Sequence, residues 1–185
     1  AHVLPELAEA GRIRAWSAGC SSGEEPYTIA MLLAMVLERM AQREWLDRVR
    51  IDASDFDKAS LETARAARYP LKAFSEAPPE IPHRFCRPVD AETVEVLPEY
   101  RALVHFHRRD LLREAPPAAP YDLIFCRNVV IYFDRATQEQ LMVRFTEALG
   151  PGGILVLGKV ETIFGPARDQ LELVDPRERI YRRAA

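Results

Sequence analysis

The residues with the clearest chemical potential are two glycines followed at once by two acids. Gly19 and Gly23 lie in the stretch Ser17-Ala-Gly-Cys-Ser-Ser-Gly-Glu-Glu-Pro-Tyr27, and Glu24 and Glu25 follow the second glycine. Glycines let a backbone approach a ligand closely, and a neighbouring carboxylate can pair with an ammonium or a sulfonium. The alternative is a tight turn with two solvated acids at a helix start, where acids are favoured in any case.

The same turn lacks the features that bind phosphates. It has no third glycine on the dinucleotide pattern, and no Lys-Ser or Lys-Thr pair for a triphosphate. Two carboxylates at the start of a helix repel a phosphate but accept hydroxyl groups or a cation. The turn therefore favours a nucleoside ligand that has no phosphate and tolerates positive charge. S-adenosylmethionine, a sulfonium, fits that description.

A further acidic position is Asp55, at the end of a strand predicted over residues 49–54. In open α/β sheets an acidic side chain at this point accepts hydrogen bonds from ribose hydroxyls. Asp57 competes for this role, but its position fits the N-cap of a helix predicted over residues 57–67. The alternative for Asp55 is a solvated loop residue, and its pairing with the glycine turn favours the ribose role.

Arg127 and Asn128 directly follow a strongly apolar predicted strand. An isolated charge at that point is costly unless it has a partner or a ligand. With Tyr132 nearby in the sequence, the Arg127 guanidinium suits a bound carboxylate, because its fork of N–H groups holds both oxygens. The alternative is a structural arginine that pairs with Glu24 or Asp134.

Composition narrows the classes of function. The chain has 185 residues, 48% of them hydrophobic, which is enough for one domain with a core. Its formal net charge of −3 gives no general attraction to nucleic acid or anionic membranes. No apolar run approaches the roughly 20 residues of a membrane span, and no secretory signal is recognisable. The widely spaced Cys20, Cys86 and Cys126 argue against a disulfide scaffold or a zinc site and suit a reducing cytoplasm.

Strands and helices alternate in the order needed to position these residues. Strands are predicted at 12–18, 49–54, 122–126, 154–158 and 178–182, and helices at 25–45, at 57–67 and from Asp134 onwards. This order predicts a mainly parallel sheet with right-handed crossovers.

Two short alternating segments interrupt that order. Residues 93–96 and 103–107 are joined through 98–101, which predicts a hairpin inserted into the sheet domain. His105 and His107 share one face of the second segment, and no third residue with ligand spacing accompanies them, so no metal site is predicted.

Three motifs, in order along the chain, resemble the CheR family of chemotaxis receptor methyltransferases. They are the glycine turn at 17–27, Ser54-Asp-Phe-Asp57 and Phe125-Cys-Arg-Asn-Val-Val-Ile-Tyr-Phe-Asp134. The resemblance implies an α/β fold with a Rossmann-like class I methyltransferase sheet that is mostly parallel and has an antiparallel last strand. It also implies one S-adenosylmethionine-binding domain over residues 1–185, with a small β-hairpin subdomain inserted at 86–108.

The resemblance further implies an enzyme that methylates glutamate side chains on the cytoplasmic helices of chemoreceptors. The methyl donor would be S-adenosylmethionine, the product S-adenosylhomocysteine and the location the cytoplasm, with no nucleic acid and no membrane insertion. Two alternatives remain at this point. One is a methyltransferase-like domain with a non-receptor acceptor, and the other is a non-catalytic cofactor-binding or interaction module.

Carried over by position, the resemblance assigns roles to individual residues. Glu25 would contact the methionine amino group, Asp55 the ribose, and Asp110 and Leu111 the adenine. Arg127, Asn128 and Tyr132 would face the methionine end and the incoming glutamate, with Arg127 and Tyr132 catalytic. The complete cofactor-binding set is Gly19, Gly23, Glu25, Asp55, Asp110, Leu111, Arg127 and Asn128.

The chain departs from the family pattern in two places. The family's helical N-terminal domain and its Thr-x-Phe-Phe-Arg-type segment do not precede the first strand here, and the sequence starts without Met, so we expect a segment of a longer protein. Gly158-Lys-Val-Glu161 also replaces the more usual Gly-His-Ser-Glu. Lys159 would either form a salt bridge with Glu161 or mark an altered choice of substrate.

Overall fold

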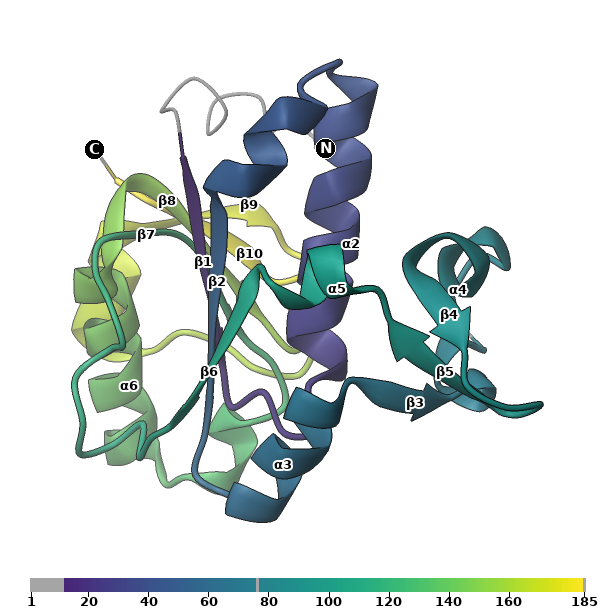
Figure 1. Ribbon diagram of the computed structural model, residues 1–185. Coiled ribbons are helices and arrows are strands. Elements are labelled where there is room, and N and C mark those ends of the chain that lie inside the picture. The colour runs from purple at the N-terminus through teal and green to yellow at the C-terminus, as the bar shows by residue number, and fades with distance from the viewer. Residues whose placement is uncertain (1–11, 76, 185) are drawn as a thin grey trace.

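A seven-stranded sheet, in the order β6-β2-β1-β7-β8-β10-β9, forms the centre of the computed structural model (Figure 1). The structure describes residues 12–75 and 77–184, so the expectations about the first residues of the chain lie outside it. The strands are β1 (Ile13–Ala18), β2 (Val49–Asp55), β6 (Val104–Arg108), β7 (Tyr121–Cys126), β8 (Leu149–Leu157), β9 (Leu171–Asp175) and β10 (Ile180–Arg183). β10 runs antiparallel to β8, whereas the pairs among β6, β2, β1, β7 and β8 are parallel. The mostly parallel sheet with an antiparallel last strand is confirmed.

Helices cover the sheet on both faces. The α-helices are α2 (Glu24–Arg39), α3 (Lys58–Ala66), α4 (Glu80–Phe85), α5 (Pro98–Arg101) and α6 (Arg135–Ala148), and the 3-10 helices are Arg43–Arg48, Leu71–Phe74, Val130–Tyr132 and Gly165–Gln170. None of the helices in the described part of the chain is long and apolar enough to cross a membrane. α2 and α6 flank the central strands from opposite sides (Figure 1).

The alternation along β1 explains the two cores. Ile13 and Ala15 belong to the apolar cluster that includes the buried residues of α2. Trp16 and Ala18 belong to a second cluster, with the buried residues of α6. Successive side chains of a strand point to opposite faces, so a strand covered on both faces is apolar at nearly every position.

The helix starts follow the predicted caps. The Asp57 carboxylate accepts a hydrogen bond from the Ser60 N–H at 2.8 Å and caps α3. Asp134 caps α6 in the same way, through the Thr137 N–H at 2.9 Å. α2 ends at Arg39, earlier than the periodicity predicts, and Ala41 has a left-handed φ of 55° just beyond it. The apolar residues that follow, up to Leu46, belong to the 3-10 helix Arg43–Arg48.

The predicted hairpin of residues 93–96 and 103–107 is wrong. β5 (Thr93–Val96) lies instead between β3 (Arg68–Pro70) and β4 (Cys86–Pro88) in a separate three-stranded antiparallel sheet. β6 pairs in parallel with β2 at the edge of the main sheet. The small inserted sheet is therefore present. β4 and β5 lie within the predicted interval 86–108, whereas β3 lies before it and β6, which is inside it, belongs to the main sheet. Alternating polarity predicts a strand but leaves its partner open.

Candidate functional site

Two adjoining cavities, of about 940 Å³ and about 640 Å³, open at the carboxyl ends of β1, β2 and β7. Both are lined by Gly19, Ser21, Arg127 and Asn128, so they form one continuous groove. In the sheet, β1 has β2 as its neighbour on one side and β7 on the other, so the order of the strands reverses its direction at β1. Such a reversal of strand order is where open α/β sheets place their ligands.

All but one of the residues predicted for the site line this groove. Glu25 lines the larger cavity, and Gly19, Arg127 and Asn128 line both; Asp55, Asp110, Leu111 and Tyr132 line the smaller one.

The exception is Gly23, which is not among the lining residues. A Cβ at this position would lie 2.7 Å from the Ala64 Cβ and 2.8 Å from the Tyr69 hydroxyl. Gly23 therefore allows the start of α2 to approach α3 and β3.

Gly19 is required by its conformation and by its neighbour. Its φ is +81°, and a Cβ there would lie only 2.4 Å from the Val129 Cγ2. The N–H groups of Gly19 and Cys20 both donate to the Ser54 carbonyl, at 2.8 and 3.0 Å. The turn after β1 is thus held against the end of β2 on one side and the loop after β7 on the other.

We expect Gly19→Ala to destabilise the fold more than Gly152→Ala does. Gly152 also has a positive φ, +72°, but a Cβ at that position would meet nothing within 4 Å. Backbone strain should cost about 1–2 kcal/mol in both variants, and the contact with Val129 should add about 1–3 kcal/mol at Gly19 alone. Urea unfolding measures both changes in the free energy of unfolding. Equal losses in the two variants would show that the contact with Val129 contributes nothing.

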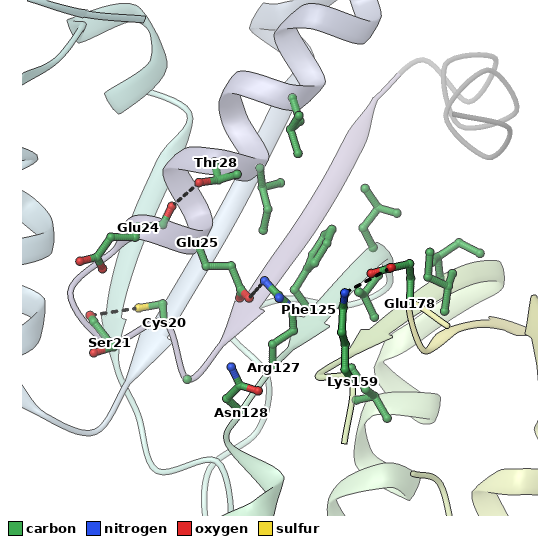
Figure 2. A pocket seen from close by; sticks show the side chains of 18 of the residues that line it. Cys20, Ser21, Glu24, Glu25, Thr28, Phe125, Arg127, Asn128, Lys159 and Glu178 are labelled. Atoms are coloured by element: carbon green, nitrogen blue, oxygen red, sulfur yellow. Dashed lines mark hydrogen bonds and ion pairs between the residues drawn. The ribbon is translucent and has the colours of Figure 1, made fainter. Parts of the chain in front are cut away.

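Glu25 is a mostly buried carboxylate with little compensation for its charge. Its Oε1 accepts a hydrogen bond from the Ser17 hydroxyl at 2.7 Å, and its Oε2 lies 3.9 Å from Arg127 Nη1 (Figure 2). Burial raises the pKa of Glu25 above its ordinary value, against the lowering effects of the Ser17 hydrogen bond and the Arg127 charge. A cation placed next to this carboxylate would lower its pKa and favour the ionised form.

Asp55 is fixed by backbone groups on both sides. Its Oδ2 accepts the Ser21 N–H at 2.7 Å, and its Oδ1 accepts the Asp57 N–H at 2.9 Å. Each carboxylate oxygen can accept a further hydrogen bond. Asp55 therefore offers the smaller cavity two preoriented acceptors, which suits a pair of neighbouring hydroxyl groups.

Phe56 also lines the groove, although the sequence motifs did not predict it as a site residue. Its side chain is 63% exposed and lines the smaller cavity, with the Arg108 guanidinium carbon 5.4 Å from its ring centroid. An exposed aromatic ring beside Asp55 offers a flat apolar face for stacking. The signal was available in the sequence, because Phe56 stands between two acids just past a buried strand.

Across the smaller cavity, Asp110 organises a short turn. Its Oδ1 accepts the Leu112 N–H at 2.9 Å, and its own N–H donates to Glu114 Oε1 at 3.0 Å. Leu111 packs against the apolar cluster of α6 and presents the rest of its surface to the cavity.

Arg127 does not pair with Glu24 or Asp134, the two partners expected of a purely structural arginine. It faces Glu25, whereas Glu24 accepts hydrogen bonds from the Ser22 hydroxyl and Asp134 caps α6. The Arg127 side chain is about half exposed, so its guanidinium is accessible from the groove.

The residues after Arg127 reach the mouth of the groove. Asn128 has a left-handed φ of 58°, which asparagine tolerates better than most residues. Tyr132 is 80% exposed at the mouth of the smaller cavity. The smaller cavity is thus lined by all three residues that the sequence placed after β7: Arg127, Asn128 and Tyr132.

Lys159 pairs with Glu178 rather than with Glu161. Its Nζ lies 3.5 Å from Glu178 Oε1, and both side chains line the larger cavity (Figure 2). Glu161 is bound instead by backbone N–H groups. The salt bridge between Lys159 and Glu161 considered from the sequence is therefore wrong.

Residues 1–180 match the family model described as the CheR methyltransferase, SAM binding domain. The chain belongs to this family. A chemotaxis protein methyltransferase of Listeria monocytogenes is 40% identical over 89% of this chain, and a probable chemotaxis protein methyltransferase of Rhizobium etli is 34% identical over 90%. The chain spans 60% and 63% of the lengths of these two CheR relatives.

A solved structure shares the fold of this CheR domain. The N-methyltransferase NodS from Bradyrhizobium japonicum, solved in complex with S-adenosyl-L-homocysteine, superposes with a TM-score of 0.54 at 15% sequence identity. The match covers 99% of this chain and 84% of NodS. It confirms the Rossmann-like class I methyltransferase fold.

Proposed function

We propose that this CheR-family chain is the catalytic domain of a cytoplasmic protein-glutamate O-methyltransferase. Its methyl donor is S-adenosylmethionine, and its acceptors are glutamate side chains on the cytoplasmic helices of chemoreceptors. The observation that carries this proposal is the convergence of Glu25, Asp55, Arg127 and Tyr132 on one groove at the carboxyl ends of the strands. The names of the CheR relatives from Listeria monocytogenes and Rhizobium etli support it.

The side chains of the groove fit an adenosyl sulfonium. Glu25 would take the ammonium of the methionine moiety, because the cation that its mostly buried carboxylate faces in the described part of the chain, Arg127, lies 3.9 Å away. Asp55 would accept the ribose hydroxyls, with Phe56, Asp110 and Leu111 around the adenine. Carboxylates at both positions disfavour a phosphate and match a ligand without one.

The reaction needs little from the protein beyond placement. S-adenosylmethionine supplies a methyl group on a positively charged sulfur, which becomes a neutral thioether when a glutamate oxygen takes the methyl. That glutamate is already ionised at neutral pH, so no general base is required. Arg127 would hold the carboxylate in line with both N–H groups of its fork, and Tyr132 would flank it at the mouth. Positioning and exclusion of water from the two opposite charges account for the rate.

Asp55→Ala tests the ribose contact. We expect the variant to bind S-adenosylhomocysteine about 10- to 100-fold more weakly, because hydrogen bonds to a charged group contribute about 1.5–3 kcal/mol. Titration calorimetry measures the affinity. The matched control is Asp57→Ala, which removes the cap of α3 and should cost about 1 kcal/mol of stability with unchanged affinity. Unchanged binding in Asp55→Ala would remove Asp55 from the site.

Methyl transfer itself is tested with labelled S-adenosylmethionine and a cytoplasmic fragment of a chemoreceptor. The proposal predicts label on the fragment that mild base releases as methanol, since the product is a carboxyl ester, and no label once the acceptor glutamates are alanines. Base-stable label would point to another acceptor chemistry. Cofactor binding without any transfer to the fragment would contradict the receptor as substrate.

A further inference from the structure

Glu161 is a buried carboxylate with an unusual set of partners. Its side chain is only 4% exposed, yet its two oxygens accept hydrogen bonds from four backbone N–H groups. Oε1 accepts from Val129 at 3.0 Å and Val130 at 2.9 Å. Oε2 accepts from Gly158 at 2.6 Å and Asn128 at 3.2 Å. Such charge-assisted bonds to backbone groups are strong, because the donors are fixed and water is excluded.

These bonds join two segments that are far apart in the sequence. Residues 128–130 follow β7 and residues 158–161 follow β8, so Glu161 holds the two strand ends together. Gly158 makes the approach possible, since a Cβ there would lie 2.7 Å from Asn128 Oδ1 and 2.8 Å from Glu161 Oε2. The loop that begins with Arg127 is therefore held through its backbone.

We propose that Glu161 is a positioning residue of the binding groove. By fixing residues 128–130 it keeps Asn128 in its left-handed conformation, with φ of 58°, and aims Asn128 and the preceding Arg127 at the groove. Glu161 does not itself line either cavity. This inference rests on the proposed function only in that the groove binds the adenosyl ligand.

A carboxylate is required at this position, and an amide does not replace it. Glutamine has one acceptor oxygen, and its NH₂ group would face the N–H donors that the second oxygen now serves. In Glu161→Gln, either Val129 and Val130 or Gly158 and Asn128 would lose their acceptor. The loop should then move, because buried N–H groups without a partner are costly.

The first test follows the four amides directly. In Glu161→Gln, hydrogen exchange measured by NMR should quicken at the N–H groups of Asn128, Val129, Val130 and Gly158 more than elsewhere in the sheet. Asp52→Asn is the matched control: Asp52 is 1% exposed and bonded to His107 and Tyr121, but it lines neither cavity. If the four amides exchange as slowly in Glu161→Gln as in Asp52→Asn, the inference is wrong.

The second test measures the consequence for binding. Glu161→Gln should weaken S-adenosylhomocysteine binding about 10-fold, the loss typical when a group that orients ligand contacts is removed, and Asp52→Asn should bind like wild type. Gly158→Ala disturbs the same junction from the other side and should reproduce the loss, which keeps the test valid if Glu161→Gln does not fold. Unchanged affinity in folded Gly158→Ala and Glu161→Gln would overturn the inference. A wild-type chain that binds no S-adenosylhomocysteine would instead contradict the proposed function, and the exchange rates would still decide whether Glu161 holds the loop.

Discussion

Replacing Arg127 with alanine is expected to lower the rate of methyl transfer about 100-fold, because the acceptor carboxylate loses the group that aligns it. Affinity for S-adenosylhomocysteine should change less than about fivefold, since a long, half-exposed ion pair contributes little; that pair joins Arg127 to Glu25 at 3.9 Å. Steady-state transfer assays and calorimetry measure the two quantities separately. Loss of Arg127 removes an interaction that lowers the pKa of Glu25, so both measurements should be compared across a pH series, which separates a change in the ionisation of Glu25 from the loss of Arg127 itself.

Arg127→Lys is the matched control for this variant. Lysine keeps the positive charge but lacks the planar fork that holds both oxygens of a carboxylate. We therefore expect Arg127→Lys to recover cofactor affinity fully and turnover only in part. Equal losses of rate and affinity in Arg127→Ala would identify a structural arginine. They would contradict the proposal that Arg127 holds the acceptor carboxylate.

Replacing Glu25 with glutamine is expected to weaken S-adenosylmethionine binding about 100-fold, since the ligand ammonium loses a mostly buried countercharge. Burial raises the pKa of Glu25 in the free protein, and below that pKa the carboxyl is neutral. Wild-type affinity should therefore rise as pH increases through this raised pKa and level off once Glu25 is ionised. In Glu25→Gln the affinity should stay low and nearly flat over the same range. Calorimetry across that range separates the two profiles.

Unfolding experiments keep this result from being confused with damage to the fold. A carboxyl whose pKa is raised by folding destabilises the folded state as pH rises through that pKa, because the ionised form prefers the unfolded chain. Glu25→Gln should thus be at least as stable as wild type at neutral pH while binding far more weakly. The neighbouring Glu24, exposed and bonded to the Ser22 hydroxyl, provides the control Glu24→Gln, which should bind normally. A pH profile in Glu25→Gln that matches wild type would exclude Glu25 as the ammonium partner.

The sequence predicts correctly those features of the fold that depend on contacts within a few residues. The caps Asp57 and Asp134 bond N–H groups three residues away, and the turn at Gly19 directly follows its strand. Asp55 and Arg127 each follow a buried strand, and parallel strands bring their carboxyl ends to one edge, so both line the groove, while their roles toward a ligand stay predictions. Local sequence patterns, together with the rule that parallel strands end at the same edge of a sheet, predict where most of the residues that line the groove lie.

The errors come from contacts between distant segments. Alternation at residues 93–96 and 103–107 predicts two strands correctly, but the partners of β5 are β3 and β4, and the partner of β6 is β2. The contacts of Gly23 with Ala64 and Tyr69 across the fold are likewise not predicted by the sequence around it, and the ligand contact of Gly23 stays a prediction. The four donors to Glu161 come from two loops about 30 residues apart, and no pattern around Glu161 itself points to them.

A crystal structure with S-adenosylhomocysteine tests the central claim most directly. Adenosine should occupy the smaller cavity, with its ribose oxygens within hydrogen-bond distance of Asp55 and its adenine beside Phe56 and Leu111. The amino group should lie against Glu25, and the sulfur should face the opening flanked by Arg127 and Tyr132. A groove that stays empty at saturating ligand, is filled by the protein's own side chains, or holds the ligand with its amino group away from Glu25 would contradict the account.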